Sequence, residues 1–146
     1  MSFIAYLQEN DSSEQRLIDV VGKLSDTDYG ADMGGGWTVA TALVHLAFWD
    51  TCRLVLLERW QLTGASDAPS DSEIINVGVQ ALATAIPARA AGELAISAAR
   101  DIDAELHKIP LELADAIEAA GQTTVLRRSV HRLSHLDDIA KALKPA

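Results

Sequence analysis

The chain has 146 residues, of which 49 % are hydrophobic and 5 % aromatic, and 21 acidic against 12 basic side chains give a formal net charge of −9. A chain of this length predicts one domain, residues 1–146, whose core is large enough to fold without a metal ion or a disulfide. The single Cys52 excludes a disulfide framework, and the acidic balance argues against nucleic acid as a partner, because phosphate recognition needs clustered Lys and Arg.

The first segments predict a cytoplasmic, helical protein. Residues 1–9 carry neither a basic stretch nor a long apolar run, so we expect no signal peptide. Apolar residues at helical spacing predict a first helix from about residue 2 to 24, and whether residues 10–13 interrupt it stays open. Residues 26–36, rich in Asp and Gly, predict a loop, and strand-like alternation is absent from the chain.

The most apolar stretch, from Trp37 to Leu57, predicts a helix buried on nearly all sides rather than a membrane span, because it contains His45, Asp50 and Arg53. Thr38 is the expected N-cap, and the helix should continue to about Leu62. No membrane partner is therefore expected.

The second half of the chain predicts two more long helices and a short one. Ser70 and Glu73 have the spacing of a capping box, and Pro87 should kink or split the third helix before it reaches about residue 108. Residues 110–121 should form a short helical segment before the last helix, which Thr123 or Thr124 caps and which runs to Leu143. Four main helices indicate an all-α fold, a four-helix bundle with neighbouring helices antiparallel.

Histidine is the residue type that offers chemistry, since imidazole is the commonest metal ligand and a proton carrier near neutral pH. His131 and His135, four residues apart on the last helix, can grip one ion from the same face. His45 lies in the apolar second helix and needs a partner there. His107, near the end of the third helix, is explained by capping.

A helical wheel argues against a metal site on the last helix. It places His131 and His135 opposite the apolar stripe, and therefore in water unless they line an open cleft. The stripe consists of Leu126, Val130, Leu133 and Ala140.

Two motifs resemble the signatures of the DinB-like superfamily (DinB/YfiT type), and the resemblance runs from about residue 3 to 143. The first is Gly36-Trp37-Thr38-Val39 followed by Leu43-Val44-His45-Leu46-Ala47-Phe48-Trp49-Asp50, and the second is His131-x-x-x-His135-Leu136-Asp137-Asp138-Ile139. The resemblance implies an up-down-down-up four-helix bundle, a divalent-metal site made of His45, His131 and His135, and a homodimer.

The resemblance also implies a reaction class. Characterised relatives include transferases and isomerases that use low-molecular-weight thiols such as bacillithiol, mycothiol or glutathione. We therefore expect a metal-dependent enzyme of thiol S-transferase, isomerase or hydrolytic type, with a metal-bound thiolate or water as nucleophile acting on a small-molecule substrate. Zinc or nickel is the first choice of ion, with iron and manganese as further candidates.

Two alternatives remain open. One is a non-catalytic, stress-associated module that binds a metal or a small molecule. The other is a helical bundle whose histidines are ordinary surface or core residues and whose main property is dimerisation.

Three residues share the face of His45 by their spacing, Thr41, Trp49 and Cys52. Thr41 and Trp49 are candidates to line a pocket, although Trp49 also suits the core. Cys52, about 10 Å along the axis, is too far away to share an ion and is expected to be an inert thiol.

Two polar residues have structural explanations. Asp50 points away from His45 and is expected to pair with Arg53 or with solvent, while Asn76 is expected to be a buried hydrogen-bonding residue, with a pocket role as the alternative. No residue is assigned as general acid or base, so the catalytic residues are unknown.

Overall fold

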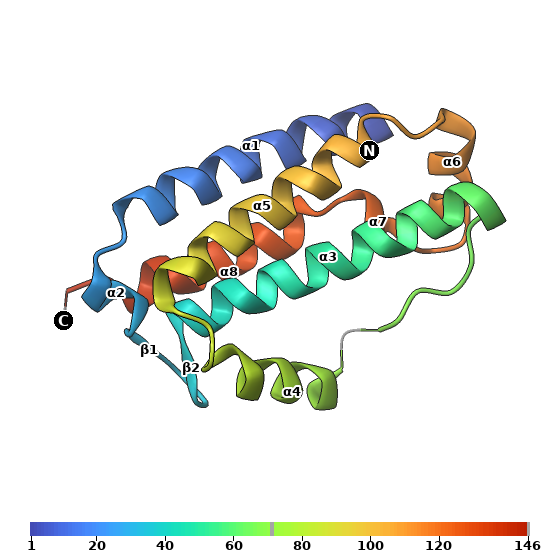
Figure 1. Ribbon diagram of the computed structural model, residues 1–146. Coiled ribbons are helices and arrows are strands. Elements are labelled where there is room, and N and C mark those ends of the chain that lie inside the picture. Colours follow the sequence, from blue (N-terminus) through green and yellow to red (C-terminus); the bar gives the residue numbers. More distant parts are fainter. Residues whose placement is uncertain (71, 146) are drawn as a thin grey trace.

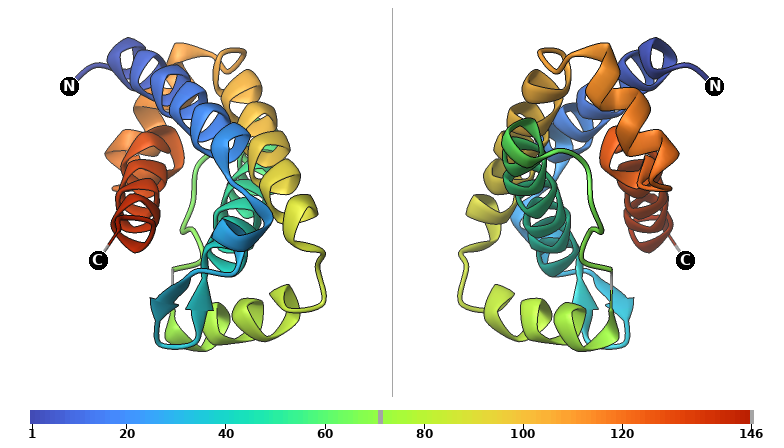
Figure 2. Two further views of the ribbon diagram at one scale, coloured as in Figure 1. Left: turned by 90° about the vertical axis from the view of Figure 1, so that its left-hand side faces the viewer. Right: turned by 90° about the vertical axis from the view of Figure 1, so that its right-hand side faces the viewer.

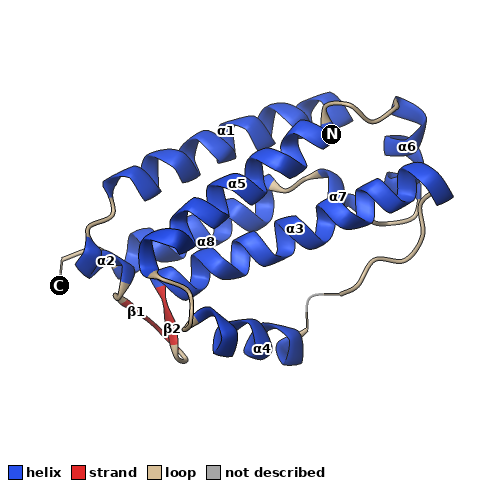
Figure 3. Ribbon diagram, in the orientation of Figure 1, coloured by secondary structure: helices blue, strands red, loops and turns tan. Residues whose placement is uncertain are grey.

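The computed structural model describes residues 1–70 and 72–145, and most of them are helical (Figure 3), which confirms the helical class. The elements follow in the order α1 (Phe3–Lys23), α2 (Asp26–Tyr29), β1 (Asp32–Gly34), β2 (Trp37–Thr38), α3 (Val39–Thr63), α4 (Glu73–Ala83), α5 (Ala88–Leu106), α6 (Leu111–Ala119), α7 (Thr123–Leu126) and α8 (Ser129–Ala142).

Four long helices, α1, α3, α5 and α8, lie side by side (Figure 1). Following the colours along the chain, α1 and α8 run in one direction, while α3 and α5 run in the opposite one. The largest interface joins α3 to α5, and α1 packs on both α8 and α5. Figure 2 shows α4 outside this group, next to the β1–β2 hairpin at one end of the molecule. That end is where the candidate site lies.

The expected loop over residues 26–36 is wrong in part, because it contains α2 and one strand of a small antiparallel hairpin. Gly34, Gly35 and Gly36 adopt φ values of 85°, 61° and 82° in the turn. Residues with side chains rarely take up this left-handed region, so three glycines permit a turn that other residues would resist. The strands pair Asp32 with Thr38, an element too short for sequence periodicity to show.

Helix α3 begins where the sequence predicts. The Thr38 side chain accepts a hydrogen bond from the Thr41 backbone N–H, and the Thr41 hydroxyl accepts one from the Thr38 N–H. Gly64 follows the helix with a φ of 82°. This helix is long and apolar enough to cross a membrane, but 67 % of its most apolar window is buried inside the protein. Its hydropathy is accounted for by its position in the core.

The third predicted helix is two helices. Ser72 is the N-cap of α4, so the predicted start at Ser70 is wrong by two residues, whereas the break at Pro87 is confirmed, because Pro87 caps α5. The side chain of Gln80 on α4 donates a hydrogen bond of 3.0 Å to the carbonyl of Gly35. This bond ties α4 to the hairpin turn.

The short helical segment before the last helix is confirmed as α6, but the last helix does not begin at Thr123. The chain forms α7, breaks, and starts again as α8 at Ser129. Buried Asn10 on α1 explains the break. Its amide donates to the Leu126 carbonyl at 2.8 Å, and its side-chain oxygen accepts from the Ser129 N–H at 2.9 Å. One side chain therefore satisfies the end of one helix and the start of the next.

The interior consists of two hydrophobic clusters with a polar layer between them. The first, around Leu17, Leu43 and Leu136, lies toward the hairpin, and the second surrounds Trp60 and Ile102. The residues of the layer come from all four long helices and are each at most 3 % exposed. They are Asn10, Ser13, Asp50, Asp103, Arg128, Ser129 and Arg132.

Gly92 on α5 packs closely against α1 and α2. A Cβ there would lie 2.6 Å from the Tyr29 hydroxyl and 2.8 Å from a methyl group of Val21. We expect Gly92→Ala to lower the free energy of unfolding by about 1–3 kcal/mol, because overpacking a core costs this much. Gly78→Ala, on α4, should instead gain up to about 1 kcal/mol from helix propensity, because an added Cβ there meets no atom within 4 Å beyond its own helix backbone and chain neighbours. Urea denaturation of both variants checks the difference, and equal values would contradict it.

Candidate metal centre

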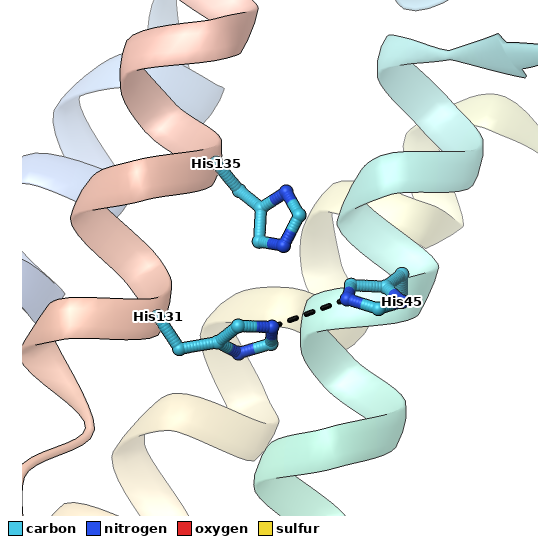
Figure 4. A group of neighbouring side chains, drawn as sticks. All are labelled: His45, His131 and His135. Carbon is cyan, nitrogen blue, oxygen red and sulfur yellow. Dashed lines mark hydrogen bonds between the residues drawn. The ribbon is translucent and has the colours of Figure 1, made fainter. Parts of the chain in front are cut away.

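Three histidine side chains from two helices point toward one another (Figure 4). His45 comes from the buried α3, and His131 and His135 come from α8, four residues apart. The ring centroid of His135 lies 4.7 Å from that of His45 and 4.7 Å from that of His131. The structure thus brings together the three residues that the resemblance implies. His45 and His131, which are in contact, lie 86 residues apart in the sequence.

The spacing of the nitrogens fits one ion. Imidazole binds zinc through bonds of about 2.1 Å, so two nitrogens on one ion lie no more than about 4.2 Å apart. The Nε2 atoms of His45 and His131 are 3.1 Å apart, and the candidate ligand atoms of all three residues lie within 4.8 Å of one another. Because 4.8 Å exceeds this limit, the three rings must close slightly around a bound ion. The ion would replace the hydrogen bond that the two Nε2 atoms share.

The environment keeps the His131 ring uncharged, as a metal ligand must be. Burial lowers the pKa of His131 to about 2, and the positive charge of Arg128 and the neighbouring imidazoles act in the same direction. The ring is therefore neutral at neutral pH, so an ion does not have to compete with a second ring proton.

A buried ionic network adjoins the cluster. Asp50 accepts a hydrogen bond from Arg128 at 2.8 Å through one oxygen and from Arg132 at 3.1 Å through the other. Arg132 also donates to both oxygens of Asp103, at 2.6 and 2.8 Å. Burial raises the pKa of Asp103 to about 6, against the opposing effect of Arg132. Arg128 reaches the cluster itself, with Nη2 3.3 Å from Nδ1 of His131.

The helical wheel misplaced the buried face of α8. Leu133 is only half-buried and Val130 is 56 % exposed, whereas Arg132 is fully buried. The predicted stripe fails because Asp50 and Asp103, from α3 and α5, compensate the charge of Arg132 inside the protein. Because the face that carries Arg132 is buried, the two histidines lie at the edge of the core, where they are half-buried rather than in water. The buried residues of α8 are Ser129, Arg132, Leu136 and Ile139.

A cavity of about 1000 Å³ opens beside the cluster. The hairpin, α3, α4 and α8 form its walls, so α4 closes a side that the four long helices leave open. His45 and His135 both line it. Sequence reasoning assigned no site role to most of the other residues of the wall, which include Asp32, Met33, Trp37, Glu73, Val77, Gln80, Asp138 and Lys141.

The two pocket candidates lie behind this wall. Among the described residues that line the cavity, Thr41 and Trp49 are both missing. The Thr41 hydroxyl is used to cap α3, and the indole N–H of Trp49 donates to the side-chain oxygen of Asn76 at 3.0 Å. Asn76 itself lines the cavity and is half-buried, so the expected buried position is wrong, while it has both the hydrogen-bonding role and the pocket position.

The remaining sequence candidates have structural roles. Asp50 is buried and binds Arg128 and Arg132, so the expected partners, Arg53 or solvent, are wrong. His107 is the C-cap residue of α5 and lies 2.9 Å from Asp11. Burial raises the pKa of Cys52, which keeps its thiol protonated at neutral pH, as expected of an inert side chain.

The network was missed because sequence reasoning treats charged residues as surface residues. One signal was present: Asp50 stands inside an apolar helix, where a buried carboxylate requires cationic partners. Arg128 and Arg132, spaced by four on a later segment, were the matching pair.

Comparison with protein families, with curated proteins and with solved structures finds no match to this chain. The metal site therefore rests on the residues and their geometry, and the reaction class rests on the resemblance of the two motifs.

Proposed function

We propose that the chain is a divalent-metal-binding protein of the DinB-like type, with His45, His131 and His135 as the ligands of one ion. The observation that carries this proposal is the convergence of three imidazoles on a space that fits an ion, next to a cavity. The directions of the long helices, α1 and α8 against α3 and α5, support an up-down-down-up four-helix bundle of that type.

We infer further that the protein is a metal-dependent enzyme acting on a small molecule, of thiol S-transferase, isomerase or hydrolytic type. Three neutral imidazoles leave coordination positions open, as catalytic rather than structural sites do. A divalent ion bound there would act as a Lewis acid and would make a thiolate or a hydroxide available at neutral pH. Imidazole suits zinc, nickel, copper and iron alike, and among these ions we keep zinc and nickel as the first choices.

The chain's own residues give the cavity the means to bind such a ligand. The Trp37 indole lies edge-on to His45, with ring centroids 5.5 Å apart, and forms an apolar wall next to the cluster. Asn76 and Gln80 of α4 bring amide groups to the same cavity. A ligand bound there can place a thiol or a carbonyl at the histidines while the remainder contacts α4.

The second candidate is a metal- or small-molecule-binding module without turnover. One observation favours it. Among the described residues, the carboxylates that line the cavity, Asp32, Glu73 and Asp138, are all exposed, whereas a general acid or base is commonly placed where burial tunes its pKa. The experiment must therefore separate binding from turnover.

Cobalt-loaded protein titrated with small thiols tests the proposal. We expect a sulfur-to-cobalt charge-transfer band in the wild type and no band in His131→Ala. Val77→Trp should weaken thiol binding at least about tenfold by filling the cavity while leaving the cobalt spectrum of the histidines intact, because Val77 lines the cavity and is not a ligand.

A matched control is available on α3. Val55 is 51 % exposed, close to the 53 % of Val77, and it lines a different cavity of about 620 Å³ between α3 and α5. Val55→Trp should leave thiol binding unchanged. Thiol binding that is lost equally in both tryptophan variants, or absent from the metal-loaded wild type, would contradict the assignment of the ligand site.

Adding electrophiles to the metal-loaded protein and a thiol tests whether the protein catalyses a reaction. Thiol conjugates formed by the wild type and not by His131→Ala support the enzyme. Thiol binding without any product over a broad set of electrophiles supports the binding module.

A further inference from the structure

Arg128 contacts His131 on the ring nitrogen that faces away from the cluster. Its Nη2 lies 3.3 Å from Nδ1 of His131. The guanidinium is held in this place, since its Nε donates to Asp50 at 2.8 Å and its Nη1 donates to the Thr124 carbonyl at 2.7 Å. With Arg128 only 3 % exposed, the contact is part of the buried network rather than a surface approach.

The direction of this hydrogen bond is fixed by chemistry. A guanidinium can only donate, so Nδ1 of His131 must accept and cannot carry a hydrogen. A neutral imidazole with no hydrogen on Nδ1 carries it on Nε2. This agrees with the 3.1 Å contact between the Nε2 atoms, in which His131 then donates and His45 accepts.

This arrangement is opposite to the usual surroundings of a metal-binding histidine. Such a ring commonly donates its second N–H to a carboxylate or a carbonyl, which leaves the other nitrogen free for the ion. Here a donor stands where an acceptor is expected, and the hydrogen occupies the atom that faces His45.

We propose that Arg128 is a positioning residue that holds metal-free His131 with its hydrogen on Nε2 and thereby weakens the binding of the ion. When Nε2 binds an ion, the hydrogen moves to Nδ1 through solvent, the ring stays neutral, and Nη2 of Arg128 withdraws from a nitrogen that no longer accepts. Binding therefore breaks one contact of the buried network. The site is tuned for an exchangeable ion rather than for the tightest binding. This inference rests on the proposed metal site.

The tautomer can be measured without any metal. Nitrogen-15 NMR of metal-free protein labelled at histidine, assigned with His131→Ala, should show the hydrogen of His131 on Nε2. A hydrogen on Nδ1 would overturn the inference even if the protein binds metal. A protein that shows the Nε2 tautomer but takes up no ion would refute the proposed function instead, so the two failures are distinct.

The effect on affinity is tested by Arg128→Gln, whose amide oxygen can accept the hydrogen of Nδ1. We expect its zinc dissociation constant to fall at least about tenfold, the lower end of the effects that groups around the ligands exert. Asp103→Asn is the control, because both oxygens of Asp103 bind Arg132 of the same network and none of the described hydrogen bonds joins Asp103 to Arg128. Its zinc affinity should equal that of the wild type.

Zinc binding by a folded Arg128→Gln that is unchanged or weaker would overturn the inference. A gain of the same size in Asp103→Asn would also overturn it, since loosening the network would then explain both. If Arg128→Gln does not fold, the nitrogen-15 NMR measurement of the His131 tautomer in the wild type tests the inference by itself.

Discussion

His45→Ala is expected to abolish specific metal binding, with a loss of affinity greater than about a hundredfold. Removing a group that merely supports a ligand costs about 10–100-fold, and His45 is one of the three proposed ligands themselves. It is also the ligand that α3 contributes, so without it the ion would be held by α8 alone. Calorimetric titration of the metal-free proteins with zinc measures the loss.

His107→Ala provides the control for that titration. His107 lies at the end of α5 and binds Asp11, outside the cluster. Its replacement should leave the zinc affinity at the wild-type value, and a similar loss in both variants would show that zinc binds nonspecifically to histidine.

Asp50→Ala is expected to lower the free energy of unfolding by about 3–5 kcal/mol, the usual cost of removing one partner from a buried ion pair. Asp50 is 1 % exposed and binds two arginines. Arg132 keeps Asp103 in the variant, whereas Arg128 loses the one carboxylate with which it forms an ion pair among the described residues. The result is an uncompensated positive charge inside the protein. Chemical denaturation followed by circular dichroism gives the value.

A surface pair serves as the comparison. Asp137 lies 2.7 Å from Arg16, with both side chains well exposed, and such pairs contribute about 0–1 kcal/mol. Asp137→Ala should therefore be nearly neutral. If Asp50→Ala were equally mild, the polar layer would not stabilise the fold in the way its contacts indicate.

The helix boundaries could be predicted where the chain carries its own signals. Thr38 caps α3, Gly64 ends it, and Pro87 separates α4 from α5, each through its own backbone or side chain. The break before α8 could not be predicted, because the residue that satisfies it, Asn10, lies on α1, 116 residues before Leu126. Interactions between distant segments leave no local pattern.

Part of the candidate site could likewise be predicted from local sequence, and part could not. Spacing alone relates His131 to His135, and the link to His45 came from the resemblance to a family rather than from periodicity. The wheel argued for water because it took the apolar stripe of the last helix as its buried face, whereas the structure completely buries Arg132, which lies outside that stripe. A pattern of hydrophobic residues cannot show that two carboxylates from other helices will meet an arginine.

We expect the fold to be stable without the proposed ion. Two hydrophobic clusters and a buried ionic network hold the four long helices together without it. Removal of the ion by a chelator should therefore leave the helical circular dichroism signal nearly unchanged. Such a result would distinguish this site from structural zinc sites, whose proteins unfold when the metal is lost.

X-ray absorption spectroscopy of the zinc-loaded protein tests the histidine centre most directly. We predict about one ion per chain with three imidazole nitrogens at about 2.0–2.1 Å, the zinc–nitrogen distance typical of proteins. Coordination by oxygen atoms with fewer than three imidazoles, or the absence of stoichiometric uptake, would contradict the assignment of His45, His131 and His135 as the ligands.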